Sequence, residues 1–215
     1  MRSVRKIYHL RSTIEEEVLD EKKVPSSPLS LFDKWMKLAI EKNPDPTAMT
    51  LATCDKNGKP SARIVLLKGY DPKGFVFFTN YQSRKSADLL QNKSASIVFY
   101  WPQIHKQVRI EGKAEKISAA ESDEYFKSRP RESQLGALAS EQSETLVSRK
   151  TLDEKYEQLE KKYSGKKISR PVYWGGFRIT PVYFEFWQGR SNRLHDRIVY
   201  KKNKGNTWKI FRLFP

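Results

Sequence analysis

From Thr47 onward, short apolar runs alternate with turn sequences, and this pattern constrains the fold more than any other feature of the chain. TAMTLATC and SARIVLLK flank the turn DKNGK, whose Asn57-Gly58 pair is a strong signal for a β-hairpin. The turn YDPKG leads to FVFFTN, and after a short helical segment come the apolar runs ASIVFYW and QVRIEGKAEKI. Because the links are short, the pattern predicts an α+β chain, mainly β, built on an antiparallel barrel or sandwich.

Helical patterns precede and interrupt these strands. Residues 28–42 place apolar side chains at helical spacing, and NPDP ends that helix. In segment 118–163, Ser118 and Glu121 form a capping-box pattern, and Pro130 marks the end of the first helical piece. A later apolar stripe predicts a helix that packs against the sheet: Leu152, Tyr156, Leu159 and Tyr163.

The chain divides into an arm and a larger unit. We expect residues 1–27, which are polar and charged, to form an N-terminal arm that is mobile in part. Residues 28–215 are expected to form a single domain with a helical insertion at about 118–163. The chain closes with predicted strands at YWGGFRITPVYFEFWQG, DRIVYKK and TWKIFRLF.

Composition excludes several classes of protein. No run reaches the ~18 apolar residues of a membrane span, and the first residues lack the apolar stretch of a signal peptide. We therefore expect a soluble, cytoplasmic protein with no membrane partner. Cys54 is the single cysteine, which excludes an intramolecular disulfide, and it is expected to be a buried thiol. The histidines His9, His105 and His195 lack metal-ligand spacing, so no metal is expected.

The charge balance points to an anionic ligand without identifying it. Lysine and arginine number 41 against 25 aspartates and glutamates, a formal net charge of +16. Such a surplus attracts nucleic acid or a small phosphorylated ligand, or forms a solvated surface. A nucleic-acid-binding module would interleave basic residues with exposed aromatic residues. Most aromatic residues here lie within strand patterns such as FVFF and VYFEF, so we expect them in the core and expect no nucleic-acid partner.

The helical segment SRKSADLLQN begins with an unusual choice of residues. Ser83 suits the N-cap position, but Arg84 and Lys85 stand where the helix dipole already carries partial positive charge. Two cations are favourable there if an anion such as phosphate binds at the same helix end. Equally, both side chains could point into solvent.

Three other segments combine cations with aromatic or hydroxyl side chains. RIVLLK carries charges at both ends of an apolar strand, YFKSRPRES offers guanidinium and hydroxyl donors, and EFWQGRSNRLHDR brings arginines and a histidine near a tryptophan. Each segment alone also fits an ordinary polar surface. The chain has no Ser-His-Asp spacing, Walker loop, GxGxxG or HExxH, so it fits a protein whose phosphorylated cofactor carries the difficult chemistry.

Taken in order, these segments resemble the pyridoxamine 5′-phosphate oxidases over about residues 28–215. The most specific pieces are SRPRESQLGA, WGGFR and RLHDR. The resemblance implies a homodimeric, FMN-binding split β-barrel with flanking helices and two FMN sites at the subunit interface. It also implies oxidation of pyridoxamine or pyridoxine 5′-phosphate to pyridoxal 5′-phosphate, with a hydride equivalent passing to FMN and oxygen yielding hydrogen peroxide.

The resemblance also assigns roles to residues. Arg193 and His195, the candidate catalytic pair, would lie beside the substrate ring, position it and tune the local field. The substrate phosphate would be bound by Lys68, Tyr125, Arg129 and Ser133. The residues implied to contact FMN are Arg63, Ile64, Val65, Leu66, Leu67, Lys68, Phe78, Thr79, Arg84, Lys85, Gln107, Gln142, Ser143, Trp187 and Arg197.

One alternative and one departure accompany the resemblance. The alternative is a split-barrel protein that binds FMN or pyridoxal phosphate without oxidase activity, which would lack the substrate-binding set that is present here. The departure lies in the arm, where Arg5 and Tyr8 fit the start of a basic stretch that folds over the active site in the family. The chain then continues HLRSTIEEEVL, with three consecutive acids.

Overall fold

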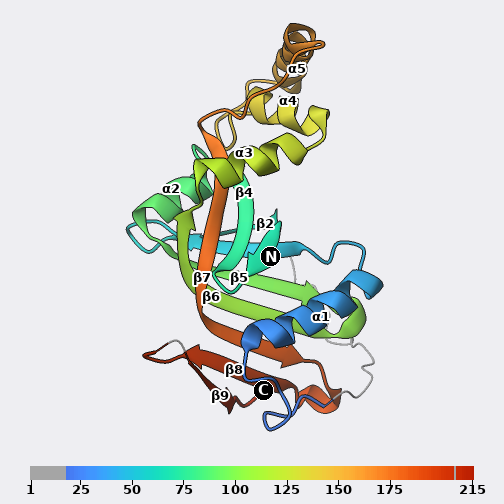
Figure 1. Ribbon diagram of the computed structural model, residues 1–215, viewed down its shortest axis with the longest axis vertical. Coiled ribbons are helices and arrows are strands. Elements are labelled where there is room, and N and C mark those ends of the chain that lie inside the picture. Colours follow the sequence, from blue (N-terminus) through green and yellow to red (C-terminus); the bar gives the residue numbers. More distant parts are fainter. Residues whose placement is uncertain (1–17, 206) are drawn as a thin grey trace, which may run out of the picture.

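The computed structural model describes residues 18–205 and 207–215, and a curled antiparallel sheet of nine strands forms its centre (Figure 1). The main path of the sheet runs β2-β1-β5-β6-β7-β4-β3, while β8 pairs with β7 and β9 pairs with β8. The predicted α+β class and antiparallel pairing are confirmed. The strands are β1 (Ala48–Cys54), β2 (Pro60–Leu66), β3 (Gly69–Asp71), β4 (Gly74–Asn80), β5 (Ser94–Trp101), β6 (Lys106–Lys116), β7 (Trp174–Gln188), β8 (Asp196–Lys202) and β9 (Trp208–Arg212).

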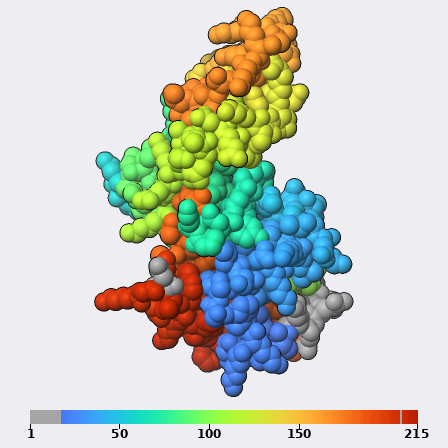
Figure 2. Space-filling view, in the orientation of Figure 1, coloured from blue at the N-terminus to red at the C-terminus, as the bar shows by residue number. Residues whose placement is uncertain are grey.

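Helices cover one part of the sheet and extend beyond one end of it. Helix α1 lies across the sheet, α2 follows β4 in the chain and contacts β1, and α3 to α5 form a lobe that projects from the barrel (Figures 1 and 2). No helix in the described part of the chain is long and apolar enough to cross a membrane. The helices are α1 (Pro28–Lys42), α2 (Arg84–Gln91), α3 (Ala119–Ser128), α4 (Arg131–Ala139) and α5 (Arg149–Tyr163), with short 3-10 turns at Pro102–Ile104 and Ser191–Arg193.

The hairpin between β1 and β2 forms at the predicted turn. Gly58 has a φ of +79°, a conformation that glycine adopts without steric cost. The Asp55 carboxylate accepts hydrogen bonds from the backbone N–H groups of Asn57, at 2.8 Å, and Lys59, at 2.9 Å. The turn sets the register in which Leu51 lies opposite Arg63, and this register carries Arg63 to the site described below.

Helix α1 buries its apolar face against the sheet. Phe32 is fully buried and makes edge-to-face contacts with Phe75 of β4 and Phe99 of β5, with ring centroids 5.0 and 5.3 Å apart. Trp35 contacts Phe186 of β7 in the same geometry at 5.2 Å. Aromatic pairs of this kind each contribute about 0.5–1.5 kcal/mol beyond the area they bury. The helix predicted over residues 28–42 is therefore confirmed and holds one face of the sheet closed.

A bulge bends the longest strand pair. The register of β6 against β7 shifts between Glu111 and Gly112. A Cβ atom at Gly112 would lie 2.2 Å from the carbonyl oxygen of Thr180, so the close approach of the two backbones requires glycine. The bulge allows the sheet to curl into the split barrel.

The helical lobe follows local signals along the sequence. The Ser118 hydroxyl accepts from the Glu121 backbone N–H, and the Glu121 carboxylate accepts in return from that of Ser118, so the capping box is confirmed. Pro130 separates α3 from α4, as predicted. A second core forms here around Phe126 and Leu135.

The predicted packing of the α5 stripe is wrong. Tyr156, Leu159 and Tyr163 pack against the small core around Leu135, and α5 lies on α4 instead of on the sheet (Figure 1). An amphipathic stripe shows that a helix has a partner, but not which partner. The lobe is therefore built around a second core, which also includes Trp174 of β7.

Two further predictions concern the arm and the cysteine. Cys54 is only half-buried, because it ends β1 on the face opposite the core residue Leu51. The arm motif at Arg5 and Tyr8, like His9, lies outside the described residues. The last part of the arm packs on the sheet: Leu19 donates its backbone N–H to the Asp196 carboxylate at 3.1 Å.

Candidate active site

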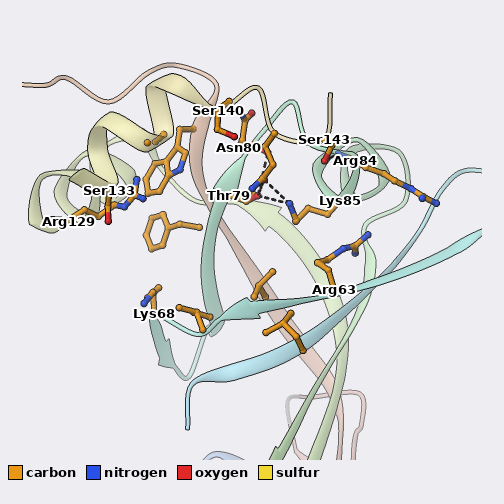
Figure 3. Close-up of a pocket in the computed structure, with 18 of the residues that line it drawn as sticks. Arg63, Lys68, Thr79, Asn80, Arg84, Lys85, Arg129, Ser133, Ser140 and Ser143 are labelled. Carbon is orange, nitrogen blue, oxygen red and sulfur yellow. Dashed lines mark hydrogen bonds between the residues drawn. The ribbon is translucent and has the colours of Figure 1, made fainter. Parts of the chain in front are cut away.

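A cavity of about 770 Å³ opens between the outer strands and the helical lobe (Figure 3). Strands β2 and β4 form its floor, the start of α2 closes one end, and α3 and α4 close the other. Among the described residues, five cationic side chains and no acidic one line it: Arg63, Lys68, Arg84, Lys85 and Arg129. This lining favours an anionic ligand, because solvent and salt only weakly screen the attraction between an anion and these cations in a partly enclosed cavity.

The cations form two groups at opposite ends of the cavity (Figure 3). Arg63, Arg84 and Lys85 gather at the start of α2, whereas Lys68 and Arg129 lie at the other end. A ligand with two separate anionic groups, or two ligands with one each, fits this distribution.

At the start of α2, buried polar groups surround Lys85. Its ammonium donates to the side-chain oxygens of Gln142, at 2.8 Å, Ser83, at 3.1 Å, and Thr79, at 3.2 Å. Burial, together with the nearby charge of Arg63, lowers the pKa of Lys85 to about 8. The protein thus holds a cation against its desolvation cost at the rim of an anion-attracting cavity.

The start of α2 is not capped as predicted. Ser83 occupies the N-cap position, but its hydroxyl donates to the carbonyl of Asn80 at 2.7 Å and makes no cap hydrogen bond. The backbone N–H of Arg84 instead donates to the Ser143 hydroxyl at 3.2 Å. Ser143 has a φ of +81°, a costly conformation for a serine. Strain of this kind is typical of residues that surrounding structure holds for binding.

Three aromatic rings form the wall at the other end. Phe78 of β4, Tyr125 of α3 and Trp174 of β7 are nearly parallel, with interplanar angles between 8° and 19°. The Arg129 guanidinium lies over the Trp174 ring, 4.6 Å from its centroid. A rigid wall of this kind fixes the direction from which Arg129 approaches a ligand.

Arg129 has a buried donor that a ligand oxygen could accept from. Its Nη1 atom is buried and has no hydrogen-bond partner among the described residues. Burial lowers the pKa of Arg129, and the nearby Tyr125 opposes that shift. A buried donor without an acceptor costs about 1–3 kcal/mol, so the site favours a ligand oxygen at this position. Lys68 and Ser133 line the cavity at the same end (Figure 3).

Strand β2 presents apolar side chains beside these cations. Ile64 is 64% exposed and Leu66 is 45% exposed, although both line the cavity. Leu67, by contrast, is buried in the main core and does not line the cavity. These exposed apolar side chains offer contact surface to a ligand ring or to another chain.

A second group of predicted site residues lies elsewhere. Gln107, Trp187, Arg193, His195 and Arg197 do not line the cavity. They lie at the far end of β6 and β7, at the start of β8 and in the loop before it. Trp174 lines the cavity at the first residue of β7, and Trp187 is thirteen residues further along that strand. At about 3.3 Å per residue, this separates them by up to about 40 Å.

Within the second group, the histidine is oriented by the backbone. The Arg190 N–H donates to Nδ1 of His195 at 3.1 Å, so the neutral ring carries its proton on Nε2. Burial and the charge of Arg193 lower the pKa of His195. The rings of His195 and Trp187 are 4.6 Å apart. The arrangement presents a neutral N–H donor next to an exposed arginine.

The buried carboxylate of Glu185 binds Arg197, the arginine of β8. Glu185 is 3% exposed and accepts from Arg197 Nε at 2.8 Å and from Arg109 Nη2 at 2.6 Å. Burial alone would raise the pKa of Glu185, but the hydrogen bonds from Arg197 and Arg109 outweigh it and lower the pKa. Arg197 is thereby fixed at the surface of the sheet.

Several residues of the cavity were missed by sequence reasoning. Trp174 stands in the segment YWGGFR, where its aromatic character and two following glycines were the available signal. A Cβ at Gly176 would lie 3.0 Å from the Phe78 ring, so the glycine allows the wall to form. The small and polar side chains that complete the lining carry no such signal: Ser61, Ala62, Asn80, Gly136, Ala137 and Ser140. In the part of the chain that the structure describes, no cluster of side chains is arranged to bind a metal ion.

Two family profiles together match most of the chain. The profile described as pyridoxamine 5′-phosphate oxidase matches residues 36–163. The profile described as the pyridoxine 5′-phosphate oxidase C-terminal dimerisation region matches residues 174–215. The cavity-lining cations all lie within the first match, and Trp187, Arg193, His195 and Arg197 lie within the second.

Curated relatives and solved structures agree with these matches. The pyridoxine/pyridoxamine 5′-phosphate oxidase of Trichormus variabilis is 48% identical over 98% of this chain and 99% of its own. That of Bordetella pertussis is 51% identical over 96% and 98%. The crystal structure of PhzG from Burkholderia lata, in complex with tetrahydrophenazine-1-carboxylic acid, superposes with a TM-score of 0.88 at 30% identity, covering 95% of this chain and 100% of its own. An FMN-binding protein of Nostoc punctiforme shares the fold, with a TM-score of 0.71 at 17% identity over 88% and 98%.

Proposed function

The chain belongs to the pyridoxamine 5′-phosphate oxidase family, and from that premise we propose that it oxidises pyridoxamine or pyridoxine 5′-phosphate to pyridoxal 5′-phosphate with FMN as cofactor. One observation carries the proposal: in the part of the chain that the structure describes, one cavity has cations at both ends, no acidic lining residue, and a buried guanidinium nitrogen of Arg129 without a hydrogen-bond partner. FMN and the substrate each bring one phosphate, which matches the two ends.

The end at the start of α2 fits the FMN phosphate. Arg63, Arg84 and Lys85 supply positive charge there, and the helix N-terminus adds to it. Thr79 and Gln142 hold the Lys85 ammonium in place. Bound FMN would supply the acceptor for the hydride equivalent that the substrate carbon gives up, with oxygen as the final acceptor.

The end beside the aromatic wall fits the substrate phosphate. Arg129 offers its unpaired Nη1, Lys68 adds a second charge, and Ser133 adds a hydroxyl. Charge-assisted hydrogen bonds of this kind contribute about 1.5–3 kcal/mol each. Tyr125, which stacks on the Phe78 ring, also lines the cavity. With both phosphates anchored, the substrate ring is held in one orientation, and orientation is the main contribution of the protein to the rate.

The second group of residues acts, in this proposal, on the cavity of a second copy. Up to about 40 Å of strand separates Trp187 from Trp174 in one chain, so Arg193 and His195 reach a cavity only through a partner subunit. A two-fold dimer brings such remote surfaces together twice, once for each cavity. The exposed Ile64 and Leu66 at the cavity rim provide apolar surface for that contact.

His195 and Arg193 then act on the substrate ring. The lowered pKa of His195 keeps its ring neutral near pH 7, and the Arg190 N–H on Nδ1 leaves Nε2 as the donor. A neutral donor orients a ring nitrogen or hydroxyl without adding charge. Arg193 supplies the positive charge, and its guanidinium offers donors only. The unit that does this is the single domain of residues 28–215 with its helical insertion.

The first measurement is the visible spectrum of the purified protein. We expect flavin absorption bands and, after adding pyridoxamine 5′-phosphate under air, equal production of hydrogen peroxide and aldehyde. Flavin bands without turnover would indicate the non-catalytic binder. A colourless protein that fails to bind added FMN would contradict the proposal.

A further inference from the structure

We propose that Asp88, acting through Thr53, is a positioning residue that aims Arg63 at the phosphate of the flavin. This inference rests on the proposed function, because it concerns the cofactor end of the same cavity. Neither Asp88 nor Thr53 lines the cavity, and neither was among the residues that the resemblance assigned to a ligand. They form a layer of buried polar groups directly behind Arg63.

The contacts form a chain from helix to strand. The Thr53 hydroxyl donates to Asp88 Oδ2 at 2.6 Å, and Arg63 Nη1 donates to the same hydroxyl at 2.8 Å. The other terminal nitrogen of Arg63, Nη2, donates to the Ser61 hydroxyl at 2.7 Å and lies 3.9 Å from Asp88 Oδ2. Helix α2 supplies Asp88, β1 supplies Thr53 and β2 supplies Arg63, so three elements fix one guanidinium.

The hydrogens in this chain have only one consistent arrangement. Arginine has donors and no acceptor, so the Thr53 oxygen must accept from Arg63. The single proton of the hydroxyl is then left for Asp88, whose ionised carboxylate only accepts. A threonine between a donor-only and an acceptor-only group is locked in one rotation. The guanidinium is therefore pre-oriented before any ligand arrives.

Electrostatics explain why a carboxylate is needed behind the strand. Arg63 stands near Lys85 and Arg84, two cations that repel it. Burial lowers the pKa of Arg63, Asp88 opposes that shift, and Arg84 reinforces it. Asp88 is 6% exposed and Thr53 is 2% exposed, so solvent screens their effect on Arg63 only weakly. Arg63 Nη1 also donates to the Leu51 carbonyl at 3.2 Å, and Asp88 adds the negative charge that offsets the repulsion from Arg84.

A purely structural role explains the same residues less well. Buried charged pairs contribute little net stability compared with apolar side chains of similar size. Arg63 also lines the cavity, where the described lining residues include four further cations and no carboxylate. Figure 3 shows Arg63 extending from β2 toward the α2 end of the cavity, where Arg84 and Lys85 begin the helix.

The test compares FMN with riboflavin, which lacks the phosphate. Full-length apoprotein, freed of flavin, is titrated with each compound by flavin fluorescence in four variants: Thr53→Val, Thr53→Ser, Asp88→Asn and the control Thr50→Val. Thr53→Val keeps the shape and removes the hydroxyl, whereas Thr53→Ser keeps the hydroxyl. Thr50 lies on the opposite face of β1 and undergoes the same chemical change. Thermal unfolding of each apoprotein reports whether the fold is intact.

We expect Thr53→Val to weaken FMN binding about tenfold and riboflavin binding less than about twofold, the cost of one misdirected charge-assisted hydrogen bond. Thr53→Ser should restore most of the FMN affinity, Asp88→Asn should behave like Thr53→Val, and Thr50→Val should bind both flavins as the unmodified chain does. Equal losses for both flavins, or no rescue by serine, would overturn the positioning role. If either Thr53→Val or Asp88→Asn unfolds the chain, the FMN and riboflavin affinities of the other variant decide the test. Unmodified apoprotein that binds FMN no better than riboflavin would instead contradict the proposed phosphate site itself.

Discussion

The ring of Phe78 stacks on the ring of Tyr125 with centroids 3.9 Å apart, although one residue belongs to the sheet and the other to the helical lobe. This contact and the edge-to-face contact between Phe126 and Trp174, at 5.2 Å, join the lobe to the barrel beside the cavity. The position of α3, and with it that of Arg129, is therefore coupled to the aromatic wall.

Two substitutions separate the ring of Tyr125 from its hydroxyl. Tyr125→Phe keeps the stack and should change the free energy of unfolding by less than about 0.5 kcal/mol, while Tyr125→Ala should lower it by about 1–2 kcal/mol. If the hydroxyl binds the substrate phosphate, Tyr125→Phe also raises the KM for pyridoxamine 5′-phosphate about three- to tenfold. Chemical denaturation and steady-state kinetics check the two effects. An unchanged KM would remove Tyr125 from the substrate-binding set.

Substitutions of two neighbouring arginines should have opposite effects, one mainly on the KM for the substrate and the other mainly on stability. Arg129→Met removes a buried unpaired donor, so stability falls by no more than about 1 kcal/mol despite the lost contact with Trp174, while the KM rises about 10–100-fold. Arg131→Met removes hydrogen bonds from the Arg131 guanidinium to the carbonyls of Lys166 and Tyr163, away from the cavity. It should lower stability and leave the KM unchanged. The opposite pattern would show that Arg129 serves the fold and not the substrate.

FMN binding should depend on pH through Lys85. Below its pKa of about 8 the ammonium attracts the phosphate, whereas above it a proton must be taken up on binding. The association constant should therefore fall by up to about tenfold per pH unit above pH 8. The unfolded chain keeps this proton up to its ordinary pKa of 10.5, so it binds more protons than the folded apoprotein between about pH 8 and 10.5. The contribution of Lys85 to apoprotein stability thus rises with pH in that window.

Lys85→Arg is the matched control for this pH dependence, because it keeps the charge at every pH used. Its FMN association constant, measured by flavin fluorescence from pH 7 to 9.5, should be nearly flat. A flat profile in the unmodified chain would show that the Lys85 ammonium does not contact the phosphate.

Two glycine substitutions should act in opposite directions. A Cβ at Gly175 would lie 2.3 Å from the Tyr81 hydroxyl, which donates to the Gly176 carbonyl, and the rigid ring cannot easily move aside. Gly175→Ala should lower the free energy of unfolding by about 1–3 kcal/mol. Gly136 lies inside α4 with open space around it, so Gly136→Ala should raise that free energy by up to about 1 kcal/mol. Urea denaturation of both variants measures the difference. Equal effects on the free energy of unfolding would contradict the close packing of Gly175 against Tyr81.

Local patterns predicted the elements, while tertiary contacts decided their partners. The alternation around Asn57-Gly58, the capping box at Ser118 and the break at Pro130 act over a few residues, so the sequence predicts them directly. The α5 stripe was assigned to the wrong surface, because an apolar face does not identify what covers it. Ser83 suits a cap equally well whether or not its hydroxyl turns to the Asn80 carbonyl.

The candidate site residues also fall into two sets that the sequence does not distinguish. The resemblance named residues that the structure gathers around one cavity, such as Lys68 and Arg129, and residues that it places at the far end of β7, such as His195. No local pattern separates these two sets, since the separation follows from the length of a 15-residue strand. Trp174 lies in a quoted segment but received no role, because its place in the aromatic wall depends on Phe78 and Tyr125.

Mixed dimers test whether the two sets act across a subunit boundary. Arg129→Met damages the cavity, and Arg193→Ala damages the remote loop, so each variant alone should have a low kcat/KM for pyridoxamine 5′-phosphate. In a dimer of one chain of each kind, one site receives both defects and the other receives none. Equal co-expression gives half mixed dimers, so the preparation should recover about a quarter of the unmodified activity.

The control is a mixture of the two separately purified variants, assayed before subunits can exchange. It should show only the average of the two low activities. Differently tagged chains allow the mixed dimer to be purified, and its activity per flavin should then reach about half that of the unmodified protein, since one of its two sites is intact. If both sets acted within one chain, every chain would carry a defect and mixing would recover nothing. Recovery therefore tests the proposal that the partner's loop reaches the cavity, which was drawn from the length of β7.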